Sequence, residues 1–111
     1  MKTIIFILLL TFTAHAETIA GKCSAVYDGD TLTIMEGTTK HKIRLAAIDT
    51  PEMKQEHGIQ SRDVLRGLVL GSTIRVEWSK KDRYGRIIGT VFENDKDINL
   101  VMLQNGCAWH Y

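Results

Sequence analysis

The feature that most constrains the fold is a set of five short segments in which apolar and polar residues alternate as they do in half-buried strands. These segments are 19–27, 31–35, 41–48, 72–78 and 86–93. The single proline of the chain, Pro51, follows the third segment and ends it, because a proline cannot continue a strand ladder. Within that segment we expect one face to carry His41, Ile43, Leu45 and Ala47, and the other face to carry Lys42, Arg44 and Ala46.

Two helical patterns complete the series. Segment 59–70 follows the third strand and carries apolar residues at positions 64, 65, 68 and 69, with Gly71 as a suitable C-terminal stop. Segment 97–106 follows the fifth strand and reads as a short helix that Asp97 caps and Gly106 ends. This order predicts an α+β fold, a five-stranded Greek-key β-barrel of the OB type with one helix after strand three and a second after strand five.

The first 16 residues have the pattern of a secretory signal peptide. Lys2 supplies a positive start, residues 4–12 form an apolar run, and Ala14-His15-Ala16 forms a small-x-small cleavage site. The apolar run is shorter than the roughly 18–20 residues that a spanning helix needs, although an uncleaved anchor is the alternative. We expect cleavage after Ala16, a secreted or periplasmic location, and one domain over residues 17–111 with no membrane contact.

The charge balance excludes a binder that works by overall electrostatic attraction. The chain has 14 Lys and Arg against 13 Asp and Glu, and loss of Lys2 with the leader lowers the formal net charge from +1 to zero. Any binding of a polyanion therefore depends on local placement of arginines. Cys23 and Cys107 are either joined by a disulfide or remain two buried thiols, and the sequence leaves both open.

Four polar clusters lie at strand ends and in loops. They are Asp28 with Asp30, Arg44, residues 49–52, and residues 82–86. Each has a structural explanation when taken singly: Asp28-Gly29 is a favoured hairpin turn, residues 49–52 read as an Asx-type turn, and either arginine can be a solvated charge. Asp30 is harder to explain, because the turn needs only one aspartate, and we interpret it as a metal ligand.

Together the motifs DGDT, RLAAIDTPE and DRYGR, in this order and at these separations, closely resemble the staphylococcal (thermo)nuclease family, also called the micrococcal nuclease family. The resemblance runs from about Ile19 to Tyr111 and includes INLVMLQNGCAW. It implies a Ca²⁺-dependent phosphodiesterase that acts on DNA and RNA and leaves 3′-phosphate ends. It assigns metal binding to Asp30, Asp49 and the backbone carbonyl of Thr50, catalysis to Arg44, Glu52 and Arg86, and a nucleotide contact to Tyr84.

These residue types suit that chemistry. Ca²⁺ takes carboxylate, carbonyl and water oxygens, whereas His41, His57 and His110 are scattered and have no zinc spacing. Two guanidinium groups can donate paired hydrogen bonds to phosphoryl oxygens on which charge builds. Glu52 would position and deprotonate the attacking water. We expect single-stranded or locally unpaired DNA and RNA as substrates and a monomeric protein.

Several alternatives stay open. The same barrel without turnover would be a nucleic-acid-binding module, while a sugar hydrolase with paired carboxylates would not call for two arginines. The resemblance implies a further helix, whereas this sequence ends at Tyr111, as either a shorter protein or a truncated product. Tyr84 is either a nucleotide contact or a core tyrosine. Trp109, His110 and Tyr111 could stack on bases; the alternative is that Trp109 packs the end of the second helix on the barrel.

Overall fold

The computed structural model describes residues 16–110. The predicted signal peptide, apart from Ala16, and the predicted stacking residue Tyr111 therefore lie outside the described residues. Between residues 16 and 110, none of the helices has the length and apolar character that crossing a membrane requires.

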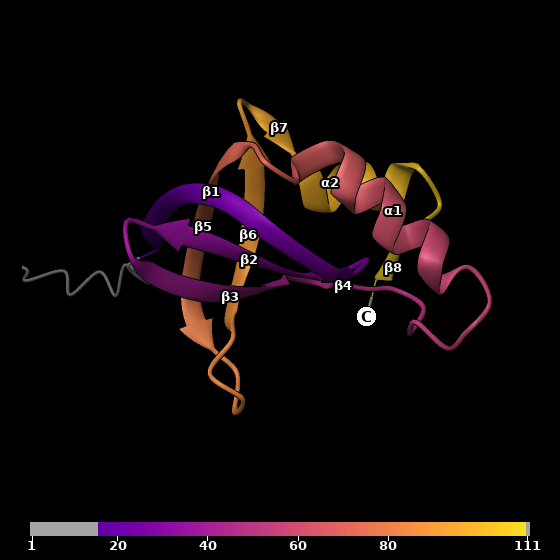
Figure 1. The fold of residues 1–111 in the computed structure, drawn as a ribbon. Helices are drawn as coiled ribbons and strands as arrows, with labels where there is room; N and C mark the ends of the chain where they lie inside the picture. The colour runs from indigo at the N-terminus through magenta and orange to yellow at the C-terminus, as the bar shows by residue number, and fades with distance from the viewer. Residues whose placement is uncertain (1–15, 111) are drawn as a thin grey trace, which may run out of the picture.

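Five strands close into a barrel. They are β1 (Glu17–Asp28), β2 (Thr31–Glu36), β3 (Thr39–Leu45), β5 (Thr73–Lys81) and β6 (Ile87–Glu93). β1 pairs antiparallel with β2 and β5, β2 pairs with β3, and β5 pairs with β6. The parallel pairing of β3 with β6 closes the barrel (Figure 1). This arrangement confirms the predicted five-stranded barrel of the OB type.

Two helices cover one end of this barrel (Figure 1). α1 (Gly58–Val69) lies between β3 and β5 in sequence, and α2 (Ile98–Gln104) follows β6, as the apolar pattern predicted. The side chain of Asp97 accepts a hydrogen bond of 3.0 Å from the backbone N–H of Leu100, which confirms the predicted cap of the second helix. Both helices bury their apolar stripes against the barrel.

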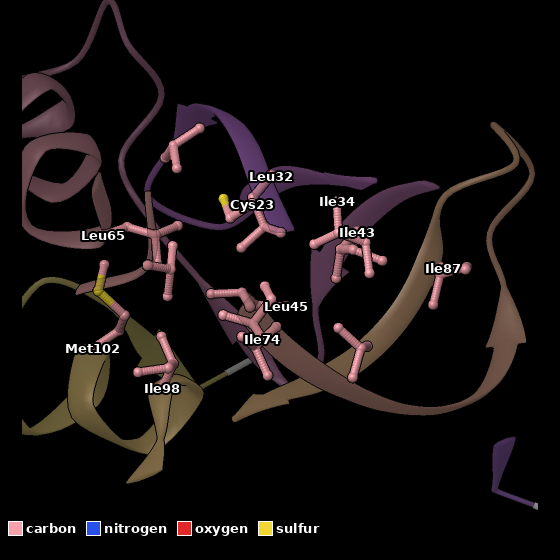
Figure 2. Packing of buried hydrophobic residues seen from close by; sticks show 14 of the residues in the cluster. Cys23, Leu32, Ile34, Ile43, Leu45, Leu65, Ile74, Ile87, Ile98 and Met102 are labelled. Atoms are coloured by element: carbon pink, nitrogen blue, oxygen red, sulfur yellow. The ribbon is translucent and has the colours of Figure 1, made fainter. Parts of the chain in front are cut away.

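The core is a single cluster of aliphatic side chains in which the strands and both helices meet. Leu65 comes from α1, Ile98 and Met102 come from α2, and the other labelled side chains in Figure 2 come from the barrel strands. Each of these three helix residues is fully buried. Since burial of apolar surface is the main favourable contribution to folding, the helices and the barrel stabilise one another.

Asn99 of α2 ties together the two strands that meet in parallel. Its side-chain oxygen accepts a hydrogen bond from the backbone N–H of Val91 at 3.0 Å, and its amide nitrogen donates to the carbonyls of Ala46 and Gly89, both at 3.1 Å. The residue is 6% exposed. A single buried amide therefore satisfies backbone groups on both sides of the closure between β3 and β6.

The third strand is shorter than predicted. β3 ends at Leu45, Ala47 has a left-handed backbone conformation with φ of 62°, and its side chain is exposed. The prediction that Ala47 shares the buried face of Ile43 was therefore wrong, because the chain turns before it reaches that position. Ile48–Asp49 instead forms β4, which pairs with β8 (Trp109–His110).

β7 (Lys96–Asp97) pairs antiparallel with the end of β6 and forms a short hairpin with it. The sequence reading missed β4, β7 and β8, since two residues are too few to show a strand alternation. Both cysteines are free thiols: Cys23 is fully buried in the core and Cys107 is partly buried against it. The structure thus favours the second of the two alternatives that the sequence left open for this pair.

Candidate active site

Asp30 is held at the start of β2 by a tight turn. The side chain of Asp28 accepts a hydrogen bond of 3.1 Å from the backbone N–H of Asp30. Between them, Gly29 passes so close to the side chains of Thr50 and Ser61 that a β-carbon there would collide with both. Asp28 and Gly29 therefore shape the turn, as predicted, and Asp30 points into the protein with only 6% of its surface exposed.

The Asp30 carboxylate has three polar neighbours. The hydroxyls of Thr31 and Thr50 donate to its two oxygens at 3.0 and 2.9 Å, and Nη2 of Arg44 lies 3.4 Å from Oδ2. Burial raises the pKa of this carboxyl, and the neighbouring Asp28 raises it further, while Arg44 and Thr50 act in the opposite direction. The negative charge of Asp30 is therefore only partly balanced by the protein.

Arg44 lies on β3 with its guanidinium group fixed on two sides. Nη1 donates to the carbonyls of Leu45 and Ile48, both at 2.9 Å. Nη2 lies 3.4 Å from Asp49 as well as from Asp30. This geometry uses the planar fork of an arginine, because one nitrogen anchors the side chain to backbone while the other faces carboxylates.

Asp49 and Thr50 follow the turn after β3. The Asp49 side chain is 45% exposed and accepts a hydrogen bond of 3.0 Å from the backbone N–H of Thr50. Backbone pairing of Asp49 with Trp109 holds this segment in place. The structure thus brings Asp30, Arg44, Asp49 and Thr50 together, with one carboxylate buried and the other open to solvent.

Glu52 and Arg86 each have a partner in their own loop. Within residues 16–110, the hydrogen-bonding partner of Glu52 is Gln55 of its own loop, to whose side chain the Glu52 N–H donates at 2.7 Å. Arg86 pairs with Asp82 of its own loop at 2.7 Å and lies 5.6 Å from the centre of the Tyr84 ring. Tyr84 is 69% exposed, so the alternative of a core tyrosine was wrong.

The donor set fits a hard cation. Asp30 and Asp49 bring two carboxylates to a single guanidinium group, and Asp30 is buried with its charge incompletely balanced. No group of three or more His, Cys, Asp or Glu that could enclose a metal ion occurs from residue 16 to residue 110. A cation here would therefore need backbone carbonyl and water oxygens beside Asp30 and Asp49, which Ca²⁺ accepts.

Sequence reasoning missed two residues of this region. The hydroxyl of Thr31 donates to Asp30 from the next position in the chain. The carboxylate of Asp82 accepts hydrogen bonds from the backbone N–H and from the side chain of Arg86. Both lie inside motifs that the sequence had singled out, DGDT and DRYGR, which is the signal that could have found them.

A separate hollow of about 270 Å³ lies over β5 and β6, with Trp78, Lys80, Ile88 and Gly89 among its lining residues. Its described lining includes none of the predicted site residues. Asp30, Arg44, Asp49 and Thr50 instead lie together at the end of β3, and we place the chemistry there.

A protein with this barrel and this grouping of acids and arginine belongs to the class of small OB-type barrels with a charged site at the ends of the strands. Residues 42–111 match the model of the family described as staphylococcal nuclease homologue. An uncharacterized endonuclease of Escherichia coli is 43% identical over 94 residues, which cover 84% of this chain and 61% of that protein.

Two further relatives extend the comparison. An uncharacterized endonuclease of Haemophilus influenzae is 39% identical over 115 residues, covering 99% of this chain and 65% of that protein. The staphylococcal-like nuclease CAN1 of Arabidopsis thaliana is 43% identical over 72 residues, covering 65% of this chain and 22% of that protein. The chain belongs to the staphylococcal nuclease family. It spans about three fifths of the length of the Escherichia coli relative.

Proposed function

We propose that this protein is a Ca²⁺-dependent nuclease that hydrolyses phosphodiester bonds of DNA and RNA and leaves 3′-phosphate ends. The observation that carries the proposal is the shared position of Arg44 between Asp30 and Asp49, each 3.4 Å from Nη2. Such a site offers oxygens to a cation and a guanidinium group to a phosphate in one place. Relatives named as endonucleases and nucleases support the same reading.

Asp30, Asp49 and the backbone carbonyl of Thr50 would hold the ion. Bound Ca²⁺ would supply positive charge that orients the phosphate and stabilises the charge developing on it. Asp30 is preorganised for this task, because the hydroxyls of Thr31 and Thr50 fix both of its oxygens. Preorganised charges aimed at the reacting group contribute more to the rate than charges that must reorient.

Arg44 and Arg86 would donate hydrogen bonds to the phosphoryl oxygens, and Glu52 would accept a proton from the attacking water. The Glu52 side chain is on an exposed loop and can meet water directly. Tyr84, with its exposed ring beside Arg86, would stack on a base. The substrate would be single-stranded or locally unpaired, and the protein would act as a secreted or periplasmic monomer.

The test is a cleavage assay with the purified chain. Single-stranded DNA and RNA are incubated with Ca²⁺, with a chelator in place of Ca²⁺, and with the Glu52→Gln and Asp49→Asn variants. Cutting that requires Ca²⁺ and is lost in both variants supports the proposal. The 3′ ends are then tested for extension by a polymerase before and after phosphatase treatment, since only 3′-phosphate ends need the phosphatase.

The second candidate function is a nucleic-acid-binding module without turnover. It is favoured by one observation, the pairing of Glu52 with Gln55 and of Arg86 with Asp82 inside their own loops. A folded protein that binds single strands but does not cut them in Ca²⁺ would support this module and overturn the nuclease proposal.

A further inference from the structure

The outer surface of the barrel carries a row of cations that begins at the candidate site. Arg44, Lys42 and Lys40 occupy alternate positions of β3 and pair in register with Thr31, Thr33 and Met35 of β2. Ile43, between Lys42 and Arg44, is buried in the core, so the exposed Lys40 and Lys42 project from the outer face, while the Arg44 side chain, 14% exposed, turns to the candidate site. Successive side chains on one face of a strand repeat at about 6.8 Å.

An aromatic ring lies beside the middle cation. Tyr27 of β1 reaches across β2, where its hydroxyl accepts a hydrogen bond of 3.2 Å from Thr33, and Thr33 is only 1% exposed. The ammonium group of Lys42 lies 5.5 Å from the centre of the Tyr27 ring. Tyr27 remains 46% exposed. The ring is thus held in position and still open to solvent.

The surrounding charges leave this row continuous with the candidate site. Lys22 of β1 and Lys40 of β3 lie at the same level of the sheet on either side of β2, since both pair with Met35. Glu36 lies at the far end of the hairpin, while Asp28 lies at the near end. Between these acids the outer face presents Lys42 beside Tyr27, with Lys40 two positions before it on β3 and Arg44 two positions after it.

We infer that this outer face, formed by Tyr27, Lys40 and Lys42, is a binding subsite for single-stranded nucleic acid that leads away from the cleaved bond. Lysines spaced along one strand bind successive phosphates, and an exposed ring stacks on a base without regard to sequence. Stacking on Tyr27 requires an unpaired base, which selects a single strand over a duplex. The inference rests on the proposed nuclease function for its role, but the binding itself can be measured without cleavage.

The experiment measures binding of a fluorescent 12-nucleotide oligothymidylate in Ca²⁺, with every protein carrying Glu52→Gln to prevent cutting. Lys42→Gln and Tyr27→Leu are each expected to weaken binding about five- to tenfold. Lys42→Gln should also reduce the salt dependence, the slope of log K against log salt, by about 0.7. Tyr27→Phe keeps the ring and should bind as tightly as the parent. Lys96→Gln, on the exposed β7, is the matched control and should change neither quantity.

Cleavage of a dinucleotide and of the 12-nucleotide strand by proteins with intact Glu52 separates this inference from the proposed function. The dinucleotide should be cut equally well by the parent, Lys42→Gln and Tyr27→Leu proteins, while the 12-nucleotide strand should be cut less efficiently by the two variants. A parent protein that cuts neither substrate contradicts the proposed function, and the binding measurements alone then decide the inference.

Three results would overturn the inference. The first is unchanged binding of the 12-nucleotide strand by both Lys42→Gln and Tyr27→Leu. The second is a weakening by Tyr27→Phe as large as that by Tyr27→Leu, which would assign Tyr27 a structural role through Thr33. The third is a loss of affinity for a 12-base-pair duplex as large as the loss for the single strand. Unfolding in urea is followed for each variant to show that all are folded under the conditions of the assay.

Discussion

Nη2 of Arg44 lies 3.4 Å from a carboxylate oxygen of Asp30, and the two side chains are only 14% and 9% exposed. Water therefore screens this pair poorly, and each charge depends on the other for compensation. The same nitrogen also meets Asp49, so one guanidinium group sets the separation of the two acids that we propose as metal ligands. Charge balance and site geometry are thus controlled by one residue.

Arg44→Lys is expected to abolish most of the nuclease activity. A lysine keeps the charge but cannot bind the carbonyls of Leu45 and Ile48 while also facing both aspartates. Losing one charge-stabilising contact typically raises the barrier by about 2.7–4 kcal/mol, which corresponds to a loss of about 10²–10³ in kcat. The measurement is steady-state cleavage of single-stranded DNA in Ca²⁺. A variant that keeps more than a tenth of the parent rate would show that the fork is not needed.

Gly58→Ala is expected to disturb the loop that carries Glu52. A β-carbon at Gly58 would overlap the backbone carbonyl of Glu52, so either α1 or the loop must move. Displacing a reacting group by about 1 Å can cost about a hundredfold in rate, and we expect at least a tenfold loss of kcat. Cleavage kinetics and urea unfolding are measured together.

Gly67→Ala is the matched control on the same helix. A β-carbon there meets nothing within 4 Å, so the change should stabilise the protein by about 1 kcal/mol through helix propensity and leave cleavage unchanged. Equal behaviour of the two alanine variants would mean that the contact between Gly58 and Glu52 does not matter.

Asn99→Ala is expected to destabilise the fold strongly. It removes three hydrogen bonds at a position that is 6% exposed and leaves the backbone N–H of Val91 without its partner. We expect the free energy of unfolding to fall by about 2–4 kcal/mol, measured by urea denaturation. Gln104→Ala, at an exposed position of the same helix, should change it by less than about 0.5 kcal/mol. Similar values for both variants would rule out a special role for Asn99.

The loop of Tyr84 and Arg86 is expected to lose stability in acid. Desolvation alone would raise the pKa of Asp82, but hydrogen bonds from the backbone and side chain of Arg86 and from the backbone of Tyr84 outweigh it and lower the pKa. A carboxyl with a lowered folded pKa stabilises the fold above the unfolded value of about 3.9, and that stabilisation is lost as the pH falls through the folded pKa.

The check is a comparison of the parent protein with Asp82→Asn. At pH 7 the variant should be less stable in urea, and the difference should shrink as the pH falls below about 4, since the parent then loses the same interaction. The Asp82 carboxyl should titrate below an ordinary aspartate in a pH series of NMR spectra. A difference between the two proteins that persists unchanged in acid would contradict this assignment.

The two cysteines should react differently with a thiol reagent. Cys23 is fully buried, and burial is the main cause that raises the pKa of its thiol above the ordinary value. Cys107 is only partly buried. One thiol per folded chain should therefore react rapidly, and both should react in denaturant. Cys107→Ser should remove the rapid reaction, and a protein with no free thiol after denaturation would show that the pair is oxidised.

The barrel was predictable from the sequence because its signals are local and repeated. Alternation along β1, β5 and β6 and the stripe of α1 each report burial on one face, whereas β2 is buried on both faces from Thr31 to Ile34. The end of β3 was not predictable, because Ala46 and Ala47 continue the apolar pattern while the chain turns. That turn is fixed by distant partners, the carbonyls of Asp30 and Gly89, which accept from Leu45 and Ala46.

The candidate site was predictable in part. The motifs located Asp30, Arg44, Asp49 and Thr50, which the structure brings together. The DRYGR motif placed Asp82 and Arg86 in one loop, but their pairing with each other depends on how the turn before β6 folds. The row formed by Lys40 and Lys42 beside Tyr27 also needed the register between β1, β2 and β3, which a single sequence does not specify.

The contacts of Asn99 have a consequence for the order in which the chain is made. Its amide binds the carbonyl of Ala46, 53 positions earlier, at the seam where β3 meets β6. A chain that grows from its N-terminus at the ribosome has β1, β2 and β3 available early, but the contacts of Asn99 across the seam can form only after α2 has emerged. The part of barrel closure that depends on this long-range contact therefore follows the synthesis of α2.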